Sequence, residues 1–77
     1  MITEMEWIDT FGDNLREIMQ ERGYTQVELA DKTYLSQATI SNYIHKKTVP
    51  TIKAVVNLSY ALDCRVDDLV DFGDIIE

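Results

Sequence analysis

The sequence contains few of the residues on which small catalytic, metal-binding and disulfide-bonded domains depend. Its 77 residues include one cysteine, one histidine, one proline and three glycines. The single cysteine, Cys64, cannot form an internal disulfide, so we expect a reducing cytoplasm as its setting. The lone histidine, His45, has no cysteine or carboxylate at metal-ligand spacing, and the sequence has no glycine-rich phosphate loop. We therefore expect no cofactor, no metal site and no enzymatic activity.

Long apolar runs are also missing. No stretch approaches the ~18 apolar residues that a membrane span requires, and the N-terminus, MITEMEWID, does not have the pattern of a signal peptide. We expect no membrane partner, and no small-molecule substrate is evident. The apolar fraction of 45% is ordinary for a globular chain, and 77 residues predict one small domain.

Positive charge is scarce as well, because the net charge is −7. This balance argues against a nucleic-acid partner, since phosphates attract lysine and arginine. However, residues 25–53 carry four lysines against two carboxylates, whereas the other positions hold three arginines against twelve carboxylates. The Debye length at physiological salt is ~8 Å, so a locally basic face can act beside a distant acidic one. We expect weak non-specific DNA binding with a shallow salt dependence.

The most informative stretch is residues 25–45, TQVELADKTYLSQATISNYIH. Thr25 and Glu28 have the spacing of a capping box, which predicts a helix over 26–33. Ser36 is the predicted cap of a second helix over 37–45. The residues that two crossing helices would bury are Leu29, Thr33, Leu35, Ile40 and Tyr43.

The other side of the second helix is small, uncharged and rich in hydrogen-bonding groups. Helical spacing places on it Gln37, Ala38, Ser41 and Asn42. Such a surface suits base-pair edges in a major groove, and a glutamine amide can pair with adenine N6 and N7. We therefore predict these four residues as base contacts, although each taken alone is equally consistent with an ordinary polar surface.

The same stretch resembles a known family. The shared positions are Gln26, Glu28-Leu29-Ala30, Ser36-Gln37, Thr39-Ile40-Ser41 and Pro50-Thr51. They are similar to the helix-turn-helix of the phage repressor/Cro-like (xenobiotic-response-element type) bacterial regulators, over residues 11–70. The resemblance implies an all-α, compact five-helix DNA-binding domain of the phage repressor type. Such domains usually act as dimers on an operator with two half-sites.

The resemblance also implies phosphate contacts. In the family, a glutamine at the position of Gln26 commonly bonds a phosphate at a helix N-terminus, where backbone N–H groups favour anions. Simple solvation is the alternative. The predicted phosphate-binding set is Thr25, Gln26, Ser36, His45, Lys46 and Lys47. The last three residues are also explained as a cationic cap on the helix C-terminus.

Two positions depart from the family pattern. Relatives usually have glycine where this chain has Tyr34, and often where it has Lys46. A side chain in left-handed backbone costs ~1–2 kcal/mol. Either the turn is reshaped, or Tyr34 is strained because its hydroxyl reaches a phosphate; we expect strain without function. Lys46 combines the same strain with a possible phosphate contact.

Apolar spacing predicts three further helices, over 11–22, 52–62 and 66–70, and Thr51 is the predicted cap of the second of these. We expect Asp13, near the start of the first of these helices, to interact favourably with the positive end of the helix macrodipole. We expect Gly23 to end the same helix. Residues 1–10 form a predicted N-terminal lead-in, either helical and packed on the body or frayed. Residues 71–77 form an acidic apolar tail, either a dimer contact or docked on the body.

The sequence therefore predicts a sequence-specific regulator that binds double-stranded DNA, and the family resemblance implies that it does so as a homodimer. Repression is more usual than activation for so short a chain. The alternative is an antitoxin or protein-interaction module that uses the same fold with an acidic partner-binding surface.

Overall fold

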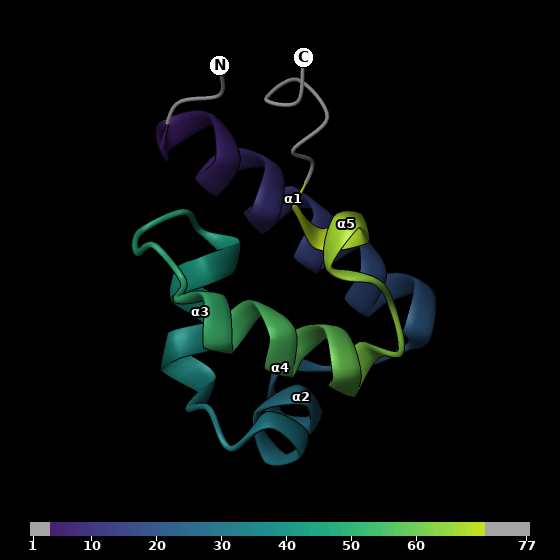
Figure 1. Cartoon of the computed structure of the whole chain (residues 1–77). Helices are drawn as coiled ribbons and strands as arrows, with labels where there is room; N and C mark the ends of the chain where they lie inside the picture. The colour runs from purple at the N-terminus through teal and green to yellow at the C-terminus, as the bar shows by residue number, and fades with distance from the viewer. Residues whose placement is uncertain (1–3, 71–77) are drawn as a thin grey trace.

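The computed structural model describes residues 4–70, with side chains from residue 6 onward. This part of the chain contains five α-helices and no strand: α1 Glu4–Arg22, α2 Gln26–Thr33, α3 Gln37–Ile44, α4 Ile52–Leu62 and α5 Val66–Leu69 (Figure 1). The all-α, five-helix expectation is confirmed. None of these helices is long and apolar enough to cross a membrane.

The predicted helix caps are present. The Thr25 hydroxyl accepts the Glu28 N–H at 3.1 Å, and the Glu28 carboxylate accepts the Thr25 N–H at 3.0 Å. Ser36 and Thr51 cap α3 and α4 in the same way, each through its side-chain oxygen. The bond from the Thr25 backbone holds the pKa of the Glu28 carboxyl below its ordinary value. The carboxylate half of the capping box therefore stabilises α2 at neutral pH and is lost as the pH falls through that lowered pKa, whereas the bond to the Thr25 hydroxyl does not titrate.

The core is built from side chains of all five helices. Its side chains are apolar and almost fully buried, and the largest are Phe11, Leu15, Leu29, Ile40, Leu58, Leu62 and Leu69. Thr33 is also buried, because its hydroxyl donates to the Leu29 carbonyl at 2.8 Å. Of the residues predicted inside the helix pair, only Leu35 is less than fully buried.

The first helix begins at Glu4 rather than at Phe11, so the described part of the lead-in continues the helix. No helix-breaking residue separates the two segments, and Trp7 packs edge-on against Phe11 with ring centres 6.1 Å apart. Asp13 consequently lies in mid-helix, where the macrodipole has little effect, and the expected role at a helix start is wrong. The predicted tail, 71–77, lies outside the described residues.

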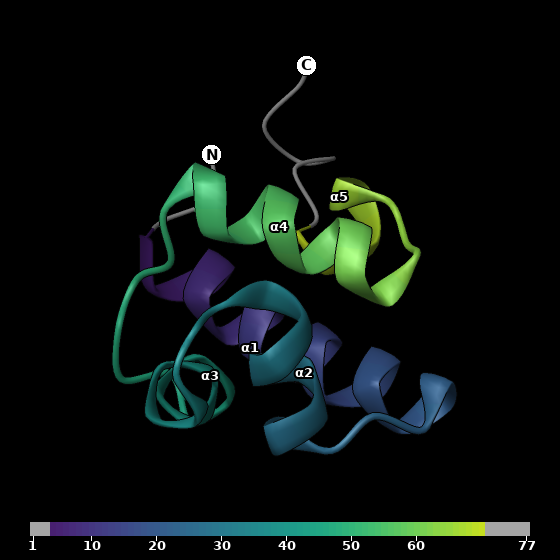
Figure 2. The same ribbon diagram turned by 90° about the horizontal axis from the view of Figure 1, so that it is seen from below.

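Glycine allows α1 and α3 to approach closely. A Cβ atom on Gly12 would lie 2.8 Å from the Tyr43 carbonyl oxygen and 3.1 Å from Cγ of Lys46. Figures 1 and 2 show the result: α3 lies at the edge of the molecule against α1 and α2, at the opposite end from α5. One face of α3 is buried and the other is open to solvent.

Left-handed backbone occurs at both positions where the family pattern predicts glycine. The φ angles are 62° at Tyr34 and 63° at Lys46, and a third case, Asp63 at 53°, was not predicted. Asp63 ends α4, and aspartate tolerates this conformation better than most residues. Helix α3 ends at Ile44, with His45 as its C-cap, one residue earlier than predicted.

Replacing Tyr34 tests the strain. Its side chain is 95% exposed, so Tyr34→Gly loses little packing. The substitution should relieve about 1–2 kcal/mol of backbone strain and lose about 0.5–1 kcal/mol because glycine makes the unfolded chain freer. The net gain in the free energy of unfolding should therefore be up to about 1.5 kcal/mol. The matched control, Tyr34→Ala, keeps the strain and should give no gain. Denaturant unfolding measures both, and equal loss in the two variants would instead show that the ring packs.

Candidate nucleic-acid interface

The four predicted base contacts lie on one side of α3, away from its buried residues Ile40 and Tyr43. Gln37 and Ala38 at the start of the helix are exposed, whereas Ser41 and Asn42 one turn later are half-buried. The face is therefore most accessible at its N-terminal end. Capping by Ser36, together with burial of the opposite side, fixes the direction in which this face points.

The two amide side chains on this face have unused hydrogen-bonding groups. Neither Gln37 nor Asn42 forms a side-chain hydrogen bond with any residue in the described range 4–70. Ser41 differs, because its hydroxyl lies 3.3 Å from Nδ1 of His45. The amide groups thus offer donors and acceptors that are unpaired within the described residues, as contacts with base edges require.

His45 is tied back to its own helix. Its Nδ1 lies 2.8 Å from the Ser41 carbonyl oxygen, which can only accept, so Nδ1 carries the proton. In the neutral ring Nε2 is then an acceptor and cannot donate to a phosphate.

A surface hollow of about 390 Å³ brings three predicted phosphate contacts together. Thr25 and Gln26 at the start of α2 and His45 at the end of α3 all line it. Arg16 and Gln20 of α1 line the same hollow and were not predicted from the sequence. Their four-residue spacing shows that they share one side of α1, but only the packing of α1 shows that this side adjoins α2. The hollow combines an arginine with a helix N-terminus, both of which favour anions.

The hydroxyl groups of Thr25 and Ser36 already serve as caps. The Ser36 hydroxyl accepts the Thr39 N–H at 3.0 Å and lies 2.7 Å from the Thr39 hydroxyl. Thr25 accepts the Glu28 N–H in the same way. Both residues are exposed, so a phosphate could reach them without a steric clash. Their hydroxyl groups, however, already take part in helix capping.

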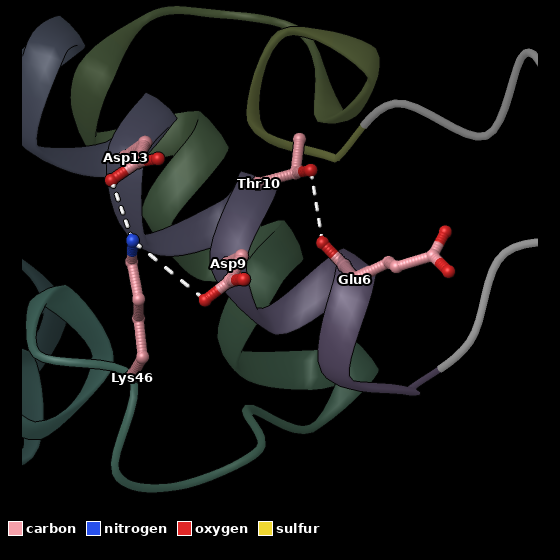
Figure 3. Close-up of polar contacts among 5 residues, drawn as sticks. All are labelled: Glu6, Asp9, Thr10, Asp13 and Lys46. Carbon is pink, nitrogen blue, oxygen red and sulfur yellow. Dashed lines mark hydrogen bonds and ion pairs between the residues drawn. The ribbon is translucent and has the colours of Figure 1, made fainter.

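The structure separates the two lysines that were predicted together. Nζ of Lys46 lies 2.9 Å from an oxygen of Asp13 and 3.7 Å from one of Asp9, and Figure 3 shows it directed at α1. Lys47 is exposed and forms no ion pair within residues 4–70. Only Lys47 presents an uncompensated charge at the end of α3.

Asparagine side chains hold the surrounding helices. Nδ2 of Asn57 on α4 donates to the Thr33 carbonyl at 2.7 Å, at the end of α2. Nδ2 of Asn14 on α1 donates to the Leu69 carbonyl at 3.0 Å. Across the described residues no three His, Cys, Asp or Glu side chains are grouped to hold a metal ion.

Comparison with known proteins agrees with this geometry. A family model described as helix-turn-helix matches residues 15–69, more than half of the chain. No curated protein matches the sequence significantly.

Two solved structures show the same fold. The restriction-modification controller protein C.AhdI from Aeromonas hydrophila has a TM-score of 0.77 at 24% identity, with 80% of this chain and 94% of that chain covered. A hypothetical transcription factor, NHTF from Neisseria, has a TM-score of 0.81 at 20% identity, with 91% of this chain and 80% of that chain covered. The resemblance seen in the sequence is confirmed: the chain belongs to the Cro/C1-type helix-turn-helix family, a family of DNA-binding regulators.

Proposed function

We propose that the protein binds double-stranded DNA in a sequence-specific manner, with α3 in the major groove. The observation that carries the proposal is the outer face of α3, where the amides of Gln37 and Asn42 have no partner in the described structure. Gln37 would pair with a base edge, Ala38 would contact a thymine methyl, and Asn42 would reach a second base or a phosphate. Contacts of this kind select sequence, whereas phosphate contacts fix orientation.

The phosphate contacts would come from both ends of the helix pair. The start of α2 supplies backbone N–H groups beside Gln26, and Arg16 adds a positive charge in the same hollow. Lys47 supplies a second charge at the end of α3. With so few free cations and a net charge of −7, the non-specific component of binding would be weak. Specificity would therefore depend heavily on the α3 face.

Selection from random duplexes tests the proposal, followed by fluorescence anisotropy on the selected site. We expect enrichment of one approximately palindromic sequence and tighter binding to it than to scrambled duplex. A protein that binds neither duplex at low salt, even at tens of micromolar, would contradict DNA binding and favour the protein-interaction module. Occlusion of polymerase from such a site would make the regulator a repressor.

Gln37→Ala distinguishes a base contact from sequence-independent binding. The residue is exposed in the first turn of α3 and alanine favours helix, so the fold should be retained. Loss of a bidentate contact should cost about 1–3 kcal/mol on the selected site and relax preference at one base position. Binding to duplexes permuted at each position measures both effects.

Gln26→Ala provides the matched comparison, because Gln26 is assigned to phosphate. It should weaken all duplexes by a similar factor and leave the base preference unchanged. If Gln37→Ala behaved in the same uniform way, the assignment of Gln37 to a base would be wrong.

A second copy of the chain is the proposed partner on DNA. Helix α4 exposes Ile52 and Tyr60, at 84% and 82% of their surface, on the same side of the helix. Ile52 also borders an apolar hollow of about 360 Å³ with Trp7 and Val70. Exposed apolar surface of this kind marks association sites. Pairing through α4 would place two α3 helices on successive major grooves, ~34–36 Å apart.

Ile52→Glu should disrupt such a dimer, because it places a carboxylate in each copy of the apolar contact. Ile52 is exposed in the monomer, so thermal unfolding of the monomer should change little. Sedimentation equilibrium should show a wild-type dimer and a variant monomer, and binding to the two half-site operator should weaken. Lys53→Gln, one residue on, lowers the net charge by the same single unit and is the control for charge alone. A monomeric wild-type protein that still binds the operator would leave the α4 surface to a partner of another kind, as in an antitoxin.

A further inference from the structure

Lys46 is held in place from two sides. Its backbone adopts left-handed φ at the end of α3, and its N–H donates to the Tyr43 carbonyl at 3.2 Å. Its side chain extends past Gly12, where α1 and α3 approach closely, and reaches toward the carboxylates of α1. A glycine at position 46 would avoid the backbone strain but could not reach these carboxylates.

The ammonium group ends between two carboxylates that lie one turn apart on α1. Asp13 is at 2.9 Å and Asp9 at 3.7 Å, and the Lys46 side chain remains 34% exposed (Figure 3). Arg16 on the next turn is the opposing positive group. The hydrogen bond from Lys46 to Asp13 is the main reason that the pKa of the lysine is raised above its ordinary value. The lysine therefore stays charged throughout the neutral pH range.

We propose that Asp13, with Asp9, acts as an internal competitor for DNA phosphate at Lys46. This inference rests on the proposed DNA binding. Two carboxylate oxygens occupy the position that phosphate oxygens would take around the ammonium group, so binding through Lys46 requires exchange of one anion for another. A cation that must first leave its own counterion contributes little to sequence-independent affinity.

This competition at Lys46 would raise the ratio of specific to non-specific DNA binding. Phosphate contacts act on every sequence, whereas Gln37 and Asn42 act only on the correct one. Withholding Lys46 lowers the first component and leaves the second unchanged. Lys47, the next residue, is exposed and unpaired within the described residues, which makes it a natural comparison at almost the same place in the fold.

Asp13→Asn should release Lys46. We expect tighter binding to random duplex at low salt and a salt slope steeper by about one unit. That slope corresponds to a roughly fourfold greater loss of affinity between about 50 and about 200 mM salt. Glu17→Gln, one turn further along α1, removes the same charge without touching Lys46 and controls for the change in net charge.

Variants of Lys46 and Lys47 show whether the effect of Asp13→Asn depends on Lys46. In a Lys46→Met background, Asp13→Asn should act no more strongly than Glu17→Gln. Lys46→Met alone should leave the slope nearly unchanged, whereas Lys47→Met should lower it by about one unit. Unfolding curves for each variant confirm that the fold is retained before binding is compared.

The opposite results are equally clear. Equal effects of Asp13→Asn and Glu17→Gln would overturn the inference, as would weaker binding by Asp13→Asn, which would make Asp13 a residue that positions Lys46 for phosphate. NMR titration of the Lys46 ammonium tests the pair without DNA, because its pKa should fall in Asp13→Asn but not in Glu17→Gln. If that pKa falls while no variant binds duplex, the pair is structural, and both the inference and the proposed function are wrong.

Discussion

The close contact between α1 and α3 determines how the rest of the molecule presents its surface. The Phe11 and Tyr43 rings meet edge-to-face with centres 5.7 Å apart, and Gly12 brings the α1 backbone against the last turn of α3. Burial of Ile40 on the same side anchors the helix along its length. Since one side of α3 is fixed in this way, the opposite side is necessarily directed to solvent. The fold thus uses apolar packing to expose polar groups.

Charge is distributed so that the same contact also limits attraction to polyanions. Asp9 and Asp13 of α1 lie at the place where α3 ends, and they pair with Lys46. Arg16, in the hollow at the start of α2, and Lys47, just beyond α3, form no ion pair within residues 4–70. A chain of net charge −7 can therefore keep a few local anion-binding positions without binding polyanions non-specifically.

Local signals in the sequence predicted the helices well. Thr25, Ser36 and Thr51 cap as expected because a cap depends only on residues three positions away. The left-handed backbone at Tyr34 was predictable from the family pattern, which has glycine at that turn. The start of α1 was left open between a helical and a frayed lead-in, because the acidic and apolar residues before Phe11 contain no clear stop or cap.

Contacts between distant segments were not predictable. Asp13 was assigned to a helix start, and its actual partner, Lys46, lies 33 positions away and is reached only through the packing of α3 on Gly12. Arg16 likewise joins the hollow at Gln26 through tertiary packing. The candidate base contacts were easier to recognise because they lie within two turns of one helix. What the sequence could not show is which of the nearby cations are already neutralised.

Amide chemical-shift mapping with the selected duplex tests the central claim most directly. If the outer face of α3 is the DNA-binding surface, the largest shift changes should fall on Gln37, Ala38 and Asn42, with a second set at Gln26. Changes concentrated on α4 and α5, around Ile52 and Val66, with α3 unaffected, would contradict the account.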